Sequence, residues 1–187
     1  EPGSSEVALR FDLPGGRFRV SAGSFFQVNT SLADRLAQEV MRLLESLLPQ
    51  AGRRATVLDL YCGVGLFSLY AASRVLRVIG VELSPEACAD FRHNLAASAN
   101  VELHAGTVEE VLPRLDLRPE AAIADPPRAG LRRRVIRALA ALGPSLLIYV
   151  SCDPATLARD ARELAACGYT LHTCLLYTSP SPRDRTR

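Results

Sequence analysis

The stretch that most constrains the fold is VLDLYCGVGLF at residues 57–67, in which an apolar run meets two closely spaced glycines and then a second apolar pattern. Residues 56–60 are β-branched or apolar with a single acidic break, which predicts a buried strand. From residue 66 to residue 70 the apolar residues follow helical spacing instead. A strand, a tight glycine turn and a helix in this order are typical of the opening of a nucleotide-binding α/β unit.

The residues around the two glycines favour S-adenosylmethionine over NAD as the ligand. A dinucleotide fingerprint needs a third small residue at the start of the helix, where this chain has Leu66 and Phe67. Asp59 adds a carboxylate near the end of the strand, which suits a ligand with a cationic amine and a sulfonium better than one with two phosphates. Glu82 ends the next apolar run about 20 residues later, where an acidic side chain can accept both ribose hydroxyls. The alternative for Glu82 is an ordinary solvated strand end.

Composition excludes several classes of protein. The 187 residues are 48% hydrophobic, which is enough for the core of one α/β domain. A net charge of +2 permits a nucleic-acid partner without requiring one. Five irregularly spaced cysteines predict neither a disulfide framework nor a metal site, and no apolar run reaches the roughly 18 residues of a membrane helix. We therefore expect a cytoplasmic monomer, and a chain that begins with Glu1 is expected to be part of a longer one.

The rest of the chain alternates between strand and helix patterns, which predicts a doubly wound, mostly parallel α/β sheet of Rossmann-like form. Residues 9–20 alternate around a Pro-Gly-Gly turn and predict a β-hairpin, and Asn29, Thr30 or Ser31 can cap a long amphipathic helix over residues 32–48. Further strands are expected at 75–82, 101–105, 121–124 and 146–151, with helices at 85–95, 108–115, 132–142 and 154–166. The expected division is a hairpin and linking segment at 1–30, a catalytic domain at 31–174, and a disordered tail, not native in character, at 175–187.

Loops after the strands carry the residues that could perform chemistry, because ligands of such sheets bind at the carboxyl ends of the strands. Cys152 follows the last strand, and Asp153 and Pro154 predict a helix start there. A thiol at a helix start is favoured as a thiolate, although the carboxylate of Asp153 opposes this. A nucleophile is therefore predicted at Cys152. The alternative is a small buried hydrophobe, which is the interpretation given to Cys88 and Cys167.

Asp125 is followed by two prolines, which exclude a helix and hold the carboxylate in an extended loop at the same sheet edge. A structural turn is the alternative interpretation. The arginines of the following helix could pair with RNA phosphates, but a solvated helix face is the preferred interpretation. They are Arg132, Arg133, Arg134 and Arg137. His93 and His104 show no metal-ligand pattern.

Four motifs, in this order, resemble those of the S-adenosylmethionine-dependent RNA uracil-5-methyltransferases, which make 5-methyluridine in transfer and ribosomal RNA. They are SFFQVN at 24–29, LDLYCGVGLFSL at 58–69, DPPRAGL at 125–131 and YVSCDPATLARD at 149–160. The resemblance extends over residues 18–171 and implies a class I methyltransferase fold. The first and last motifs are more similar to the branch that acts on ribosomal RNA, with 23S ribosomal RNA as the expected target, than to the transfer RNA branch.

The resemblance also implies roles for individual residues. Gln27, Tyr61, Glu82 and Asp125 are implied to contact S-adenosylmethionine, and Cys152 is implied to be the nucleophile that adds to C6 of uracil. Covalent addition makes C5 electron-rich, so the difficult methylation is divided into two easier steps. Position 66 is often a polar ligand contact in the family, and Leu66 departs from that pattern.

The C-terminal residues depart further from the family. A glutamate soon after a strand beginning at Tyr169 is implied as the general base, yet no glutamate follows Glu163. Residues 174–187 resemble a translated sequencing adapter. Family members also carry an N-terminal RNA-binding β-barrel, and some carry an iron–sulfur cluster; neither is expected in these residues.

Three alternatives remain open. The chain could methylate another RNA base, a transfer RNA uridine or a small molecule. It could be an RNA- and cofactor-binding module without turnover, which the missing glutamate permits. It could be an NAD oxidoreductase, although Asp59 and Phe67 argue against that.

Overall fold

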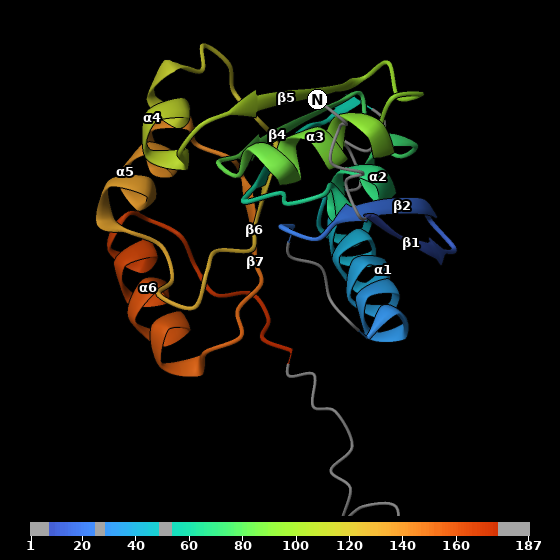
Figure 1. Cartoon of the computed structure of the whole chain (residues 1–187). Helices are drawn as coiled ribbons and strands as arrows, with labels where there is room; N and C mark the ends of the chain where they lie inside the picture. The colour runs from blue at the N-terminus through green and yellow to red at the C-terminus, as the bar shows by residue number, and fades with distance from the viewer. Residues whose placement is uncertain (1–7, 25–28, 49–53, 176–187) are drawn as a thin grey trace, which may run out of the picture.

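The computed structural model describes residues 8–24, 29–48 and 54–175, which form a two-stranded hairpin and a five-stranded sheet flanked by helices (Figure 1). The strands are β1 Ala8–Leu13, β2 Gly16–Ser21, β3 Thr56–Leu60, β4 Arg77–Glu82, β5 Val101–Ala105, β6 Ala121–Ala124 and β7 Leu146–Tyr149. The helices are α1 Thr30–Leu47, α2 Leu66–Ala72, α3 Pro85–Asn94, α4 Val108–Val111, the 3₁₀ turn η2 Leu112–Arg114, α5 Arg133–Leu142 and α6 Pro154–Ala166.

The large sheet is parallel throughout, in the order β5-β4-β3-β6-β7. The chain builds outward from β3 to β5 on one side and from β6 to β7 on the other. The loops after β3 and β6 therefore leave neighbouring strands in different directions, and in such sheets this switch point forms the ligand crevice. The predicted doubly wound α/β fold is confirmed.

Two layers of helices bury the two faces of the sheet. Alternate residues of β3 face opposite ways, so that Val57 packs with α1, α2 and the hairpin, whereas Leu58 and Leu60 pack with α4, α5 and α6. Figure 1 shows the same division, with α4, α5 and α6 on one side of the sheet and α1, α2, α3 and the hairpin on the other. Burial on both faces explains why the three central strands, β3, β4 and β6, are mostly apolar, whereas the edge strand β5 carries Glu102 and His104.

The hairpin is held on α3 by side chains rather than by strand pairing with the main sheet. Asp90 is buried and accepts hydrogen bonds from the Ser21 amide (2.7 Å), the Ser21 hydroxyl (2.8 Å) and the Ser24 hydroxyl (2.7 Å). The side chain of Asn94 pairs with both peptide groups of Arg19, accepting at 2.7 Å and donating at 3.0 Å. These contacts fix the point at which the chain enters the SFFQVN segment.

Most predicted elements form at the expected residues. Residues 101–105 and 121–124 form the expected strands, and Asn29, Ser84 and Asp153 each accept hydrogen bonds from backbone amides as helix N-caps. The second strand of the main sheet begins at Arg77 instead of residue 75, because the Val75 amide donates to Ala71 and prolongs the turn after α2. The predicted strand beginning at Tyr169 is wrong within the described residues: 169–175 pair with no strand, and Leu171 is 79% exposed.

Candidate active site

The glycine loop after β3 adopts a conformation that its residue types explain. Tyr61, Gly63 and Gly65 all have positive φ (61°, 54° and 93°), and two glycines remove the strain that side chains would suffer at their positions. A Cβ at Gly65 would lie 2.5 Å from Leu95 Cδ1, so this glycine lets α2 start close to α3. A Cβ at Gly63 would meet no atom of the described residues within 4 Å. With respect to that part of the chain, Gly63 therefore borders open space at the sheet edge.

Glu82 ends β4 beside this loop and is not an ordinary solvated strand end. One carboxylate oxygen accepts from the Gly63 amide at 2.9 Å, and the other accepts from the amides of Leu83 (2.8 Å) and Ser84 (2.7 Å). Hydrogen bonds to a carboxylate are charge-assisted and stronger than neutral ones. Glu82 thus fixes the position of the loop and presents an anionic group at the edge of the crevice.

Asp59 lies beneath the loop, fully buried, with one unusual feature. Its Oδ2 accepts from the Ser68 hydroxyl at 2.6 Å, whereas its Oδ1 has no partner in the described structure. Burial raises the pKa of Asp59 to about 7, a hydrogen bond from Ser68 opposes the shift, and the charges of Asp125 and Glu82 add to it. A buried oxygen without a partner is costly, so Asp59 suits a donor or a cation brought by a ligand.

Tyr61 and Asp125 lie after the two strands at the switch point. The Tyr61 ring is half-buried against the cluster formed with α4, α5 and α6, and burial followed by the charge of Glu109 raises the pKa of its phenol above the usual value. The Asp125 amide donates to Leu60 at 3.3 Å, and Asp125 keeps an exposed face. Partial removal of the Asp125 carboxyl from water by the surrounding protein raises its pKa to about 6.

The Cys152 loop lies next to the Asp125 loop. Ala124 pairs with Tyr149, and the Val150 amide donates to Ala124 at 2.8 Å, so Asp125 follows opposite Val150 and Cys152 comes two residues later. Cys152 is exposed at the start of α6. Asp153 accepts from the amides of Ala155 and Thr156, both at 2.9 Å, and these bonds hold the pKa of Asp153 below its usual value. Asp153, the carboxylate expected to oppose a thiolate at Cys152, is therefore already hydrogen-bonded to two amides in the first turn of α6.

One contact joins these two loops directly. Arg128 Nε lies 3.7 Å from Asp153 Oδ2, so the residue three positions after Asp125 reaches the residue next to Cys152. Of the predicted site residues, Tyr61, Glu82, Asp125 and Cys152 all lie on loops or strand ends at this sheet edge. Gln27 lies outside the described residues.

The two cysteines expected to be buried differ. Cys88 is buried as predicted, but the prediction for Cys167 is wrong, because Cys167 is exposed. It lies three residues after buried Leu164 and would share that face in a longer helix, but α6 ends at Ala166 and Gly168 turns the chain with a φ of 97°.

Sequence reasoning missed three side chains that hold the site. Asn94 donates to the Val64 carbonyl of the glycine loop at 3.0 Å while it binds Arg19 of the hairpin. Asp90 fixes Ser24, as described above, and buried Asp160 binds both the Asp125 loop and the end of β7. All three are polar residues on the inward-facing sides of helices whose other inward-facing residues are apolar. In the sequence, the only sign of their role is this interruption of the amphipathic pattern.

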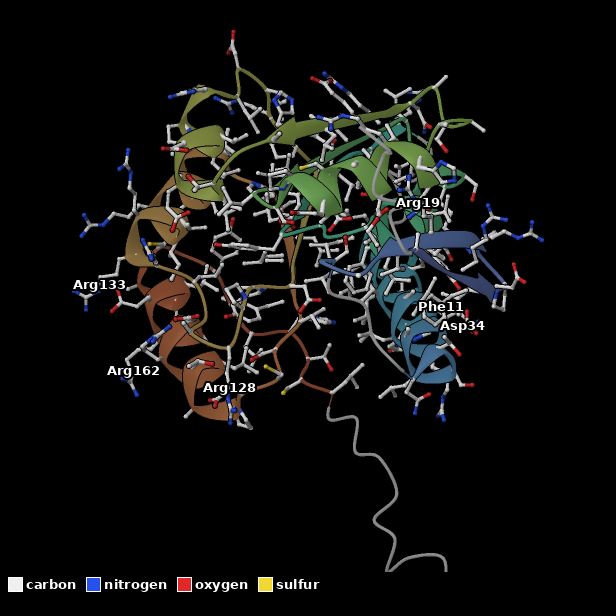
Figure 2. All side chains as sticks on the ribbon, viewed as in Figure 1. Phe11, Arg19, Asp34, Arg128, Arg133 and Arg162 are labelled. Atoms are coloured by element: carbon white, nitrogen blue, oxygen red, sulfur yellow. The ribbon has the colours of Figure 1, made fainter. Side chains whose placement is uncertain are left out.

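The arginines of α5 line its exposed side. Arg132 lies 3.5 Å from Glu109 and Arg133 lies 2.8 Å from Glu163, whereas Arg134 and Arg137 are exposed and have no acidic partner in the part of the chain that the structure describes. Figure 2 shows Arg133 and Arg162 on the outer side of α5 and α6 and Arg128 at the end of α6. Among the described residues, no group of histidine, cysteine and acidic side chains is arranged to hold a metal, and no helix could cross a membrane.

Comparison with known proteins agrees with this geometry. Residues 57–125 match the family described as "Methyltransferase domain". The chain is 43% identical over 164 residues to an uncharacterized RNA methyltransferase of Streptomyces coelicolor, a match that covers 86% of this chain and 35% of that protein. It is 41% identical over 161 residues to an uncharacterized RNA methyltransferase of Gloeobacter violaceus, covering 85% and 34%. The chain spans about a third of the length of these curated relatives.

Solved structures give the same result for the fold. A Pyrococcus abyssi tRNA (uracil-54, C5)-methyltransferase in complex with S-adenosyl-L-homocysteine superposes with a TM-score of 0.72 at 32% identity, covering 84% of this chain and 38% of that chain. Precorrin 8W decarboxylase of Methanobacterium thermoautotrophicum superposes with a TM-score of 0.61 at 26% identity, covering 71% and 72%. The architecture is the Rossmann-like fold of class I methyltransferases.

Proposed function

We propose that the protein is an RNA methyltransferase that transfers a methyl group from S-adenosylmethionine to C5 of a uridine, in ribosomal rather than transfer RNA. The observation that carries this proposal is that three features lie at the sheet edge that contains the switch point. They are the glycine loop, which is hydrogen-bonded to Glu82, the Asp125 loop and the exposed Cys152. The similarity to RNA methyltransferases and to a tRNA (uracil-54, C5)-methyltransferase supports it. The ribosomal target rests on the SFFQVN and SCDPATLARD motifs.

The residues around the glycine loop fit S-adenosylmethionine. When bound, this molecule supplies a methyl group on a positively charged sulfonium. Burial raises the pKa of Asp59, and the charges of Asp125 and Glu82 add to the shift, so a cation close to these three carboxylates is electrostatically favoured. Among the described residues, Asp59 Oδ1 has no partner and Gly63 borders open space, and Glu82 offers acceptor oxygens for hydroxyl donors. A dinucleotide with two phosphates would meet repulsion from the same carboxylates.

Cys152 would activate the base. Its thiolate adds to C6 of uracil, and the electron pair of the C5–C6 double bond moves to O4 as an enolate. C5 is then nucleophilic and takes the methyl group. Release then requires a base that removes the proton from C5, so that the double bond re-forms and the thiolate leaves; the resemblance implies a glutamate for this step, and no glutamate follows Glu163 in the sequence. Because Cys152 is exposed and its neighbour Asp153 is engaged by two amides, the thiol is open to a base extruded from RNA.

The exposed side of α5 suits an anionic polymer. Guanidinium groups bind phosphate through paired hydrogen bonds, and Arg134 and Arg137 have no competing carboxylate in the described residues. The arginine-bearing helix starts directly after the Asp125 loop. We therefore propose that the RNA backbone lies next to the exposed side of α5. The sequence alone favours the other interpretation, in which these arginines are only solvated.

The test is the product. The protein is incubated with methyl-labelled S-adenosylmethionine and either a ribosomal or a transfer RNA transcript, and the RNA is digested to nucleosides. The proposal predicts label in 5-methyluridine, and more of it from the ribosomal transcript. Label in another nucleoside would contradict the uracil chemistry, and equal or greater labelling of transfer RNA would contradict the target. Tight binding of NAD without binding of S-adenosylmethionine would contradict the whole proposal.

A further inference from the structure

The loop that carries Asp125 has almost no regular secondary structure of its own to hold it. After β6 ends at Ala124, the two prolines lack amides, and the loop makes one internal turn in which the Gly130 amide donates to Pro127 at 2.7 Å. The loop is therefore held mainly by contacts from outside it. Side chains of α6 supply several of these contacts, and the buried one among them is Asp160, in the middle of α6.

Asp160 is 1% exposed, and both of its carboxylate oxygens accept hydrogen bonds. Its Oδ2 accepts from the Leu131 amide at 2.6 Å, at the end of the Asp125 loop, and from the Tyr149 hydroxyl at 2.7 Å, at the end of β7. Its Oδ1 accepts from Arg159 Nε at 2.8 Å. One buried carboxylate thus joins the Asp125 loop, the strand that leads to Cys152, and the helix that Cys152 precedes.

Arg159 completes the contact from the same helix. Its Nη2 donates to the Ala129 carbonyl at 2.7 Å while its guanidinium pairs with Asp160. Gly130, between the two bonded loop residues, has a φ of 76°, and a Cβ there would lie 2.4 Å from Asp160 Oδ2. Only glycine lets the loop approach the carboxylate this closely, so the loop and the carboxylate are matched to each other.

A buried carboxylate is an expensive way to hold a loop, because Asp160 loses its hydration although Arg159 stays half exposed. An apolar contact would stabilise the fold at lower cost. What the carboxylate adds is direction: a hydrogen bond to a loop amide constrains the angle as well as the distance of approach, and charge-assisted bonds are the stronger ones. This is the arrangement expected of a group that positions other residues.

We propose that Asp160 is a positioning residue that locks the Asp125 loop and the Cys152 loop into one unit, so that cofactor contact and nucleophile keep a fixed separation. This rests on the proposed function, because it assigns Asp125 to the cofactor and Cys152 to the substrate. Arg159 and Tyr149 are the supporting members of the unit. None of the three touches the reacting atoms.

The test compares Asp160→Asn with Glu163→Gln. Asparagine keeps the size of the side chain but loses the charge and one acceptor, whereas Glu163→Gln weakens a different contact of α6, the exposed pair with Arg133 of α5, and leaves both loops untouched. Hydrogen exchange of the Leu131 amide, affinity for S-adenosylmethionine by calorimetry, and methyl transfer at saturating cofactor are measured at a temperature where both variants are folded.

Asp160→Asn is expected to speed exchange at Leu131, to weaken cofactor binding roughly tenfold, and to lower kcat at saturating cofactor, with Glu163→Gln unchanged in all three. Tyr149→Phe, which removes one of the bonds to Asp160, should show a smaller effect in the same direction. If folded Asp160→Asn keeps wild-type cofactor affinity and kcat, the residue is structural only and the proposal fails. The exchange and affinity measurements need no RNA, so failure of the proposed uracil chemistry would be seen separately, in the wild-type protein.

Discussion

Asn94 of α3 donates one hydrogen bond to the Val64 carbonyl of the glycine loop at 3.0 Å. The same side-chain amide also accepts from the backbone N–H of Arg19 and donates to the Arg19 carbonyl. The loop and the hairpin are thereby fixed to one side chain, although residues 19 and 94 lie 75 positions apart. The SFFQVN segment begins three residues after the hairpin ends. The site is therefore organised around α3 as well as around the strand ends.

Replacing Asn94 by alanine should weaken both stability and cofactor binding. Three hydrogen bonds are lost at about 1 kcal/mol each, so the free energy of unfolding should fall by roughly 3 kcal/mol. Asn100→Ala is the matched control, because Asn100 donates to Ala72 and Val75 at the opposite end of α2. Urea unfolding should detect a loss in both variants, and calorimetry should detect weaker S-adenosylmethionine binding in Asn94→Ala alone. Equal cofactor affinity in the two variants would show that Asn94 does not position the loop.

Glu82→Gln should lower the affinity for S-adenosylmethionine. The change removes the charge and leaves one acceptor oxygen for three backbone amides, which should cost about 1.5 to 3 kcal/mol, or roughly tenfold to a hundredfold in Kd. The control is Glu86→Gln, four residues later, where the side chain is exposed in the first turn of α3; this variant should bind as the wild type does. Calorimetric titration measures both. An unchanged Kd for Glu82→Gln would remove Glu82 from the binding site.

The buried Asp59 makes stability depend on pH. The pKa of Asp59 in the folded protein, about 7, is above the usual value of 3.8, so the folded state keeps this proton up to a higher pH than the unfolded chain does. The free energy of unfolding should therefore fall as pH rises from about 4 to 7 and then level off. Relative to Asp59→Asn, which cannot ionise, the wild type should lose roughly 2 to 3 kcal/mol between pH 5 and pH 8. Urea unfolding at both pH values tests this, and parallel behaviour of the two proteins would contradict a buried, titrating Asp59.

Arg134 and Arg137 should contribute to RNA binding through phosphates. Replacing both by glutamine should weaken binding and reduce the slope of log Kd against log salt by about 1.4, since each contact to single-stranded RNA contributes about 0.7. The control is Arg54→Gln with Arg118→Gln, two exposed arginines that precede β3 and β6 and so lie at the opposite edge of the sheet. Fluorescence anisotropy over a salt series gives both slopes. If the two double variants lose the same slope, binding is diffuse and α5 has no special role.

The strands could be predicted from sequence almost to the residue where the signal was local. Residues 121–124 form a short apolar run that ends at Asp125 and two prolines, and residues 101–105 follow a turn, so each strand has marked ends. Glu82, Asp125 and Cys152 were found in the same way, because each ends or follows a predicted strand, whereas the role of Tyr61 was implied only by the family resemblance.

What could not be predicted depends on partners distant in the sequence. The roles of Asn94 and Asp160 require knowledge of where Val64 and Leu131 lie after folding. The end of the last helix at residue 166 was predicted, but the exposure of Cys167 depends on how the chain turns away after that end, at Gly168. The strand that the resemblance implies at Tyr169 is absent from the described residues, because a strand forms only where a neighbouring strand pairs with it; here Tyr169 instead packs against the α5 side of the sheet and donates to Pro144 at 3.2 Å.

The central claim, covalent activation of a uridine by Cys152, is tested most directly with a 5-fluorouridine-substituted RNA. Fluorine cannot leave C5 as a proton does, so the adduct accumulates after methyl transfer whether or not a general base is present. The protein is incubated with this RNA and S-adenosylmethionine, denatured, and examined by gel electrophoresis and mass spectrometry. The account predicts a denaturation-resistant, methylated complex that forms with the wild type and with Cys167→Ala, another exposed cysteine, but not with Cys152→Ala. Absence of that complex from a folded protein that binds S-adenosylmethionine, or its persistence in Cys152→Ala, would contradict the proposed chemistry.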